Sequence, residues 1–268
     1  MEDNIVPKLN WLQERLMLDE KELAKIVSKC PRIMHYSLED NIEPTLDWLQ
    51  QRLGLDDTEL SKMIQSRPYI LSYSIPDNIE PKLNWLQQRL NLTDDGLSKL
   101  LQQMPSILKL SIPDNLEPKL KWLQYRLSLT DEELSEFIQR MPSILNLSIP
   151  DNMEPKLNWL QQRLSLTDEE LSKLIQQMPP LLSCNIDTNL DPTINFYIDA
   201  LGDESKALAL VTRNPSSLTF SLEKRLKPRL QEAQDAGTII DSSFLSSMMA
   251  YTEDGWNKRL LKEMDKHR

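Results

Sequence analysis

The sequence predicts an all-α superhelical solenoid of 37-residue repeats, each made of two helices plus a short third helix or 3-10 turn. The first observation is a decapeptide, PKLNWLQQRL, whose leading proline recurs in steps of 37 residues. A fixed period in this range is typical of repeat proteins, whose units pack on their neighbours. The second is the low count of five glycines, which favours helices over turn-rich β structure. The decapeptide is unchanged at 81–90 and 155–164, is similar at 7–16, 44–53 and 118–127, and is more divergent at 192–201.

The first helix of a repeat is clearest in the unit that begins at Asp114. Asp114 and Asn115 offer an N-cap, and Glu117 stands three residues after Asp114, as in a capping box. Pro118 falls in the first turn, where a missing N–H costs little. The helix is expected to run to about Leu127. Its apolar stripe at helical spacing consists of Leu116, Leu120, Leu123 and Leu127.

The second helix begins at another capping box, formed by Thr130 and Glu133, and carries an apolar face. Pro142 disfavours helical dihedrals for Met141 and ends the helix there. The apolar segment 142–149 is then expected to be a short third helix or 3-10 turn. A strand is the alternative, but an isolated strand would leave backbone groups unpaired. Equivalent boxes are Thr167–Glu170 and Asp56–Glu59, and the inner face comprises Leu134, Phe137 and Ile138.

The repeats divide the chain into three parts. Residues 1–191 form five regular repeats, although Gly96 removes the capping-box glutamate from the third. Residues 192–227 form a degenerate sixth repeat, because terminal repeats are usually atypical. Residues 228–268 form a C-terminal helical cap. Its expected helices are Pro228–Ala236, Ser242–Tyr251 and Trp256–Met264, with a break at Gly237.

Composition limits the functions that the chain can have. The net charge of −10 repels phosphate overall, so the mean field adds little non-specific affinity for nucleic acid. Cys30 and Cys184 match no disulfide or metal spacing, and no apolar run reaches 18 residues. The first residues, MEDNIVPKL, resemble neither a signal peptide nor an Arg-rich transit segment. The expectation is a cytosolic chain, or a mature or truncated form.

No catalytic constellation is present in the sequence. The serine-hydrolase, phosphate-loop, dinucleotide-binding and zinc-protease motifs are missing, and there are only two histidines. Recurring carboxylates such as Asp131 and Glu133 stand at helix starts, where capping and the helix dipole explain them. The sequence therefore predicts that the protein is not an enzyme and uses no cofactor or metal.

The pattern of most functional interest lies on the first helix of each repeat. Lys119, Trp122 and Arg126 are spaced i, i+3 and i+7 and share one face. A ladder of such groups is suited to following a phosphate backbone. The structural alternative is that each tryptophan packs between units, while the arginine pairs with a neighbouring carboxylate or a helix carbonyl. The triplet recurs at Lys8–Trp11–Arg15, Lys82–Trp85–Arg89 and Lys156–Trp159–Arg163, and Thr45 replaces the lysine before Trp48 and Arg52.

A second basic cluster follows the sixth repeat in the segment SLEKRLKPRL. It is the densest positive run in the chain. Its alternative interpretation is a solvated helix start. The cluster consists of Lys224, Arg225, Lys227 and Arg229.

At these residues the chain resembles the mitochondrial transcription termination factor (mTERF) family. The resemblance rests on a recurring proline, a short apolar segment, a polar spacer and a helix opening with proline and lysine. Instances are MPSILNLSIPDNMEPKLNWL at 141–160 and RPYILSYSIPDNIEPKLNWL at 67–86, and 214–237 is similar to the family's closing motif. The resemblance implies a superhelix of three-helix repeats whose basic concave groove binds nucleic acid in mitochondria or in plastids such as chloroplasts. It also implies a role in transcription termination or regulation, RNA processing or ribosome assembly.

The resemblance and the ladder together give the expected partners and site. We expect double-stranded DNA or RNA as the partner, a monomer, and no association with membranes. The alternative is a protein-interaction scaffold with a basic protein partner, favoured by the acidic balance. The candidate nucleic-acid-binding residues are Arg52, Arg89, Arg126, Arg163, Lys82, Lys119, Lys156, Lys224, Arg225, Lys227 and Arg229.

Overall fold

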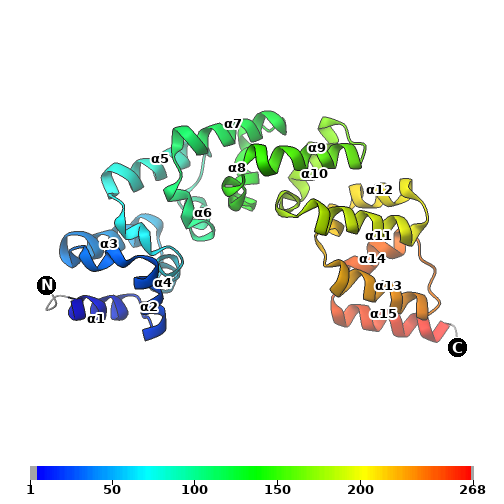
Figure 1. Cartoon of the computed structure of the whole chain (residues 1–268), viewed down its shortest axis with the longest axis horizontal. Helices are drawn as coiled ribbons and strands as arrows, with labels where there is room; N and C mark the ends of the chain where they lie inside the picture. The colour runs from blue at the N-terminus through cyan, green and yellow to red at the C-terminus, as the bar shows by residue number, and fades with distance from the viewer. Residues whose placement is uncertain (1–4, 267–268) are drawn as a thin grey trace. The chain divides into compact units, whose positions relative to one another are not determined.

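The computed structural model describes residues 5–266, with side chains to residue 259 (Figure 1). Positions 1–4 of the expected first repeat and 267–268 of the expected cap lie outside the described residues. Within the described part of the chain every regular element is an α, 3-10 or π helix. The prediction of an all-α protein built from 37-residue units is therefore confirmed.

One repeat consists of two α-helices, a 3-10 helix and a single π turn. In the third repeat α5 (Glu80–Arg89) and α6 (Asp94–Gln103) are followed by the 3-10 helix η6 (Pro105–Lys109). The π turn η7 (Ile112–Leu116) then continues into the first helix of the next repeat. The short third element is thus a 3-10 helix, as the sequence predicted, and no strand replaces it in the described residues.

The chain divides into two compact units, Met1–Asn146 and Leu147–Arg268. The α-helices of the first unit are α1 (Ile5–Arg15), α2 (Glu20–Lys29), α3 (Glu43–Leu53), α4 (Asp57–Ser66), α5, α6, α7 (Glu117–Arg126) and α8 (Asp131–Arg140). Those of the second are α9 (Glu154–Arg163), α10 (Asp168–Gln177), α11 (Asp191–Leu201), α12 (Glu204–Arg213), α13 (Lys227–Asp235), α14 (Ser242–Ala250) and α15 (Glu253–Lys266).

The 3-10 and π elements recur in the same order throughout. The 3-10 helices are η2 (Pro31–His35), η4 (Pro68–Ser72), η6, η8 (Pro142–Asn146), η10 (Pro179–Ser183) and η12 (Pro215–Thr219). The π turns are η3 (Leu38–Ile42), η5 (Ile75–Ile79), η7, η9 (Ile149–Met153), η11 (Ile186–Leu190) and η13 (Leu222–Leu226).

The second helices start and end as the sequence predicted. Thr130 accepts a hydrogen bond from the Glu133 N–H, and the Glu133 side chain accepts from the Thr130 N–H. The third repeat keeps only the first of these bonds, from the Gly96 N–H to Thr93. Met141, before Pro142, leaves the helical region at φ −145° and ψ 71°. Complete capping boxes are also present at Asp19, Asp56 and Thr167.

The predicted start of the first helix was wrong by three residues. Ser111, rather than Asp114, is the N-cap, because its hydroxyl oxygen accepts from the Asp114 N–H. The hydroxyl in turn donates to the Asp114 carboxylate at 2.6 Å. Ser-x-x-Asp is itself a capping signature, so the sequence contained the signal.

Each first helix of repeats one to six is followed by a residue in the left-handed region, with φ between 45° and 61°. Only two of these six residues are glycine, which adopts that conformation without steric cost. The others are held there by the turn into the second helix. The positions are Met17, Gly54, Asn91, Ser128, Ser165 and Gly202.

The core is formed by the predicted apolar stripes. Leu116, Leu120 and Leu123 of the first helix are completely buried. Leu134 and Ile138 of the second helix are also completely buried. Each unit is therefore built on leucine-rich layers that repeat along the chain.

The sixth repeat and the cap depart from the regular pattern. Gly202 is followed directly by Asp203, the N-cap of α12, so the leucine found here in other repeats is missing. The three expected cap helices are present as α13, α14 and α15, with ends shifted by up to three residues.

Candidate nucleic-acid interface

The predicted lysines on the first helices point into the fold. Lys82, Lys119 and Lys156 are only 4% to 8% exposed. The Lys119 ammonium donates to the backbone carbonyl of Leu145, the fourth residue of the 3-10 helix in its own repeat, at 2.6 Å. Lys82 and Lys156 make the equivalent bonds to Leu108 and Leu182. Each lysine therefore ties the first helix of a repeat to its third.

Burial has an electrostatic consequence for these lysines. Loss of hydration disfavours the charged ammonium and lowers the pKa of Lys82, Lys119 and Lys156. Their charge is directed at carbonyl oxygens inside the repeat. In this conformation they offer no ammonium group to a phosphate in solvent.

Two of the buried lysines also contact an asparagine one turn earlier. Asn115 Oδ1 accepts a 3.4 Å bond from Lys119, four residues later. Asn152 Oδ1 accepts the equivalent 3.3 Å bond from Lys156. Asn41 and Asn189, which precede Thr45 and Thr193, have buried Oδ1 atoms without a partner, and so does Asn78, which precedes Lys82. The asparagine and the lysine therefore pair in two repeats, whereas the bond from the lysine to the 3-10 helix carbonyl is the constant contact.

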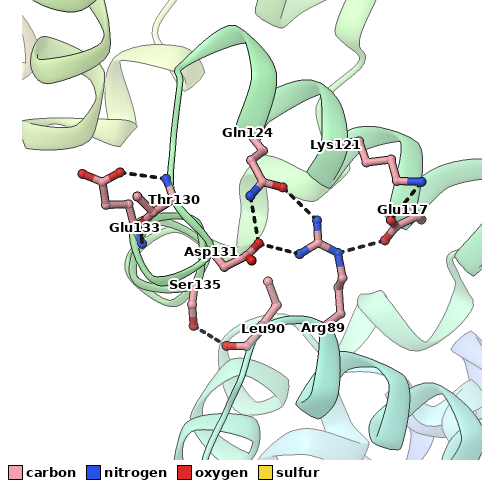
Figure 2. Close-up of polar contacts among 9 residues, drawn as sticks. All are labelled: Arg89, Leu90, Glu117, Lys121, Gln124, Thr130, Asp131, Glu133 and Ser135. Carbon is pink, nitrogen blue, oxygen red and sulfur yellow. Dashed lines mark hydrogen bonds and ion pairs between the residues drawn. The ribbon is translucent and has the colours of Figure 1, made fainter.

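Three of the predicted arginines, Arg52, Arg89 and Arg163, join one repeat to the next. We use the term arginine clasp for such an arginine together with its acceptors in the following repeat. Arg89 Nε donates to Glu117 at 3.1 Å, and its two Nη atoms donate to Asp131 at 3.4 Å and Gln124 at 3.1 Å (Figure 2). Gln124 also donates to Asp131 at 2.8 Å, which closes a ring of polar contacts.

The same clasp recurs at other repeat junctions. Arg52 donates to Gln87 at 2.9 Å and to Asp94 at 3.2 Å. Arg163 donates to acceptors that include Asp191 and Glu204, at 3.2 and 3.0 Å. Arg15, which was not among the candidates, makes a clasp with Asp47, Gln50 and Asp57. Arg126 is not free either.

The clasp arginines are therefore already neutralised by carboxylates. Arg89 and Arg163 keep about a fifth of their side-chain surface exposed, and each has two acidic partners. At these junctions the arginines pair with neighbouring carboxylates, which is the structural alternative given for them in the sequence analysis. A ligand phosphate at such an arginine would have to compete with acids that the protein itself supplies.

The C-terminal basic cluster is divided between two roles. Arg229 is 4% exposed and donates to the carbonyls of Met248 and Tyr251 at 2.8 and 2.9 Å, and to Glu253. Arg225 donates to the carbonyls of Met249 and Tyr251 at 2.6 and 2.9 Å. These two arginines cap the end of α14, where a helix leaves carbonyls unpaired.

The other two members of the cluster face solvent. Lys227 is exposed and pairs with Glu223, one turn earlier. Lys224 is exposed and makes no ion pair within the described residues. These lysines are the members of the predicted set with the most accessible charge.

The repeat tryptophans are half-buried. They are neither fully buried in the core nor fully exposed for stacking on a base. They are Trp11, Trp48, Trp85, Trp122 and Trp159.

Three pockets lie at equivalent places between consecutive repeats, each beside an arginine clasp. The pocket at Arg89 has a volume of about 600 Å³, and its acidic lining residues are Asp131, Glu132 and Glu136. Arg89 is the only cation that lines it. The pockets at Arg52 and Arg163 measure about 440 and 620 Å³. The acidic lining of the pocket at Arg89 suits cationic groups better than phosphates.

The described residues contain no group of three or more His, Cys, Asp or Glu side chains arranged to hold a metal ion. Among these residues, no helix has the length and apolar character needed to cross a bilayer.

The sequence was also compared with known proteins. A family model described as mTERF matches residues 1–89 and 51–257, which together cover nearly the whole chain. No curated protein matches the chain.

Proposed function

The chain belongs to the mTERF family, and from this premise we propose that it binds nucleic acid and regulates transcription, including termination, in a mitochondrion or a plastid. The family match over residues 1–257 is the observation that carries the proposal. Proteins of this family are organellar in general, and the family and its helical-repeat fold are generally not enzymatic. We propose double-stranded DNA as the first ligand to test, RNA as the second, and a monomer as the active form.

The structure favours some candidate contacts over others. Lys82, Lys119 and Lys156 are the least suitable, because their ammonium groups are buried against carbonyls. The clasp arginines would have to exchange a carboxylate for a phosphate. Exposed cations such as Lys224 need no such exchange, so we propose that binding uses few phosphate contacts.

The test is fluorescence-anisotropy binding to duplex DNA, single-stranded DNA and RNA across a salt series. For duplex DNA the logarithm of the affinity falls with the logarithm of salt concentration with a slope of about −0.9 for each phosphate contact. We expect measurable binding with a slope of only about −2 to −4, since most predicted arginines are neutralised. Absence of binding to all three ligands at low salt would refute the proposal.

The variant Arg89→Glu with Arg126→Glu tests the clasp arginines directly. Loss of binding with retained helicity would place these side chains in the interface. Because the glutamate introduced at position 89 would face Glu117 and Asp131, thermal stability must be measured in parallel.

A second candidate function is a protein-interaction scaffold with a basic partner. The specific observation is the acidic pocket beside Arg89, where glutamate occupies position 136 while the equivalent residue in neighbouring repeats is Lys99 or Lys173. A scaffold of this kind would bind a lysine-rich peptide. Its affinity should fall in the variant Glu132→Gln with Glu136→Gln, and equal affinity of this variant and the wild-type protein would argue against it.

A further inference from the structure

We propose that the pocket between α12 and α14 binds a phosphate group. The pocket has a volume of about 570 Å³ and lies wholly within the second unit. Its apolar lining residues are Ala209 and Leu210. Its polar lining consists of Lys206, Arg213, Asn214, Ser242, Ser243 and Ser246, with no carboxylate among the lining residues.

The pocket differs from its counterparts because acidic positions of the repeat have been replaced. Lys206 stands where the regular repeats carry the capping-box glutamate, for example Glu133 and Glu170. Ser242 and Ser243 stand where α8 begins with an aspartate and a glutamate. Two acids remain at the start of α12, and both are paired: Glu204 with Arg163 through the clasp, and the N-cap Asp203 with Lys206. The substitutions thus change the local charge in the direction that suits an anion.

The strongest donor in the pocket is not used by the fold. Arg213 occupies the register position of Lys29 in the first repeat, which donates to the backbone carbonyls of Gln65 and Ser66. The Arg213 side chain is exposed and has no hydrogen bond or ion pair within the described residues. A guanidinium presents its N–H groups as a planar fork that matches two oxygens of a phosphate.

The other polar groups complete a donor set. Lys206 is 67% exposed at its side chain and pairs loosely with Asp203 at 3.3 Å. The hydroxyls of Ser242 and Ser243 make no hydrogen bond within the described residues, so both can donate. The Asn214 side-chain amide donates a 3.3 Å hydrogen bond to the Ser246 hydroxyl. This bond links the end of α12 to α14. Asp241, which precedes α14, is the N-cap of this helix and accepts from the Phe244 N–H.

The charge distribution along the chain agrees with this placement. Residues 192–268 contain equal numbers of acidic and basic residues, so the net charge of −10 arises entirely in residues 1–191. An approaching polyanion is repelled least by the sixth repeat and the cap. The phosphate could come from a nucleic-acid backbone, in which case the inference rests on the proposed function, or from a small phosphate compound.

The experiment uses the full chain, a single and a double test variant, and a control that matches the charge change of the single variant. The test variant is Arg213→Gln, alone and with Lys206→Gln. The control is Arg67→Gln, which removes an exposed arginine from the end of another second helix, where its Nη1 contacts only the adjacent Ser66 carbonyl. Circular dichroism should show equal helicity for all variants, because each changed side chain is exposed.

Two ligands distinguish the two sources of phosphate. Binding of a fluorescein-labelled DNA duplex is measured by anisotropy in a salt series, and binding of inorganic phosphate is measured by calorimetry. If the backbone is the source, Arg213→Gln should weaken DNA binding about tenfold and reduce the salt slope by about 1, while the control stays close to wild type. If a small phosphate compound is the source, inorganic phosphate binds and Arg213→Gln abolishes its heat of binding.

Each result decides between the possibilities. If DNA affinity falls equally in Arg213→Gln and in the control, the proposal that the pocket binds phosphate is refuted, and the proposed function is unaffected. Phosphate binding that depends on Arg213, without binding of duplex DNA, supports the pocket and excludes double-stranded DNA as the ligand of the proposed function. Absence of both kinds of binding in the wild-type protein overturns the pocket, and the proposed function is refuted as well if single-stranded DNA and RNA also fail to bind.

Discussion

Replacing Lys119 with threonine should destabilise the protein by about 2 kcal/mol. The substitution removes a charged donor from the Leu145 carbonyl and from Asn115 Oδ1, which lie 2.6 and 3.4 Å from the ammonium nitrogen. Leaving buried acceptors unpaired costs about 1 to 3 kcal/mol each. The cost is partly offset because the buried ammonium is no longer desolvated. Threonine is the natural residue at this position in two other repeats, so the backbone accepts it.

The reciprocal change, Thr45→Lys, should stabilise the protein by about 1 kcal/mol. Asn41 Oδ1 is buried without a partner, and a lysine at position 45 would stand in the register from which Lys119 and Lys156 donate to Asn115 and Asn152. The double variant Lys119→Thr with Thr45→Lys keeps the net charge and controls for general electrostatic effects. Its stability should lie between those of the two single variants, because the sites belong to different repeats.

The assay is urea denaturation followed by circular dichroism, together with DNA binding by anisotropy. We expect the midpoint to fall for Lys119→Thr and to rise for Thr45→Lys, with binding unchanged in the first variant. An unchanged midpoint combined with loss of binding would refute the structural role of the lysine. It would show that the lysine belongs to the interface, as the sequence pattern first suggested.

Three further predictions concern other features of the repeat. Arg89→Ala should cost about 1 kcal/mol in unfolding free energy through loss of its clasp, whereas Arg67→Ala should change it by less than about 0.5 kcal/mol. The pKa of Asp94 should lie below its ordinary value, because Gln87 and then Arg52 hydrogen-bond the charged carboxylate; nuclear magnetic resonance titration should show it rising in Gln87→Ala. The stabilisation is present above the unfolded-state pKa and is lost as the pH falls through the folded-state value. Met17→Gly should raise the melting temperature, since position 17 has φ 50° and the residue is 58% exposed.

The fold was predictable because its determinants are local. Capping boxes, prolines and leucine spacing act within one repeat, and the 37-residue period carries them along the chain. The start of the first helix was misplaced because two adjacent capping signals compete there. Ser111 is the cap in the structure, and Asp114 is its partner three residues later. Both capping signals are present in the sequence, but the sequence alone does not show which residue is the N-cap.

The candidate site was less predictable because a side chain's partner depends on the next repeat. Lys119 and Arg126 share one helical face. Lys119 is nevertheless buried against the 3-10 helix of its own repeat, whereas Arg89, the counterpart of Arg126 in the preceding repeat, donates to acceptors in the next repeat. Helical spacing fixes the face of a residue, whereas its partners are fixed by packing. The acids that neutralise Arg89 stand 28 and 42 residues later, a separation that no pattern within one repeat contains.

Near-identical repeats make these partnerships testable within one chain. Ala200 replaces the clasp arginine in the sixth repeat. The two positions that carry its acidic partners in other repeats are occupied here by Lys227 and Ser242. Arg229 occupies the register position of the buried lysines and, like them, donates to carbonyls at a helix end. At the position of the buried lysines, lysine and arginine thus both stabilise the fold. Arg213 differs, because it stands in the position of Lys29 and yet its side chain makes no hydrogen bond or ion pair within the described residues, so it is left available for a ligand.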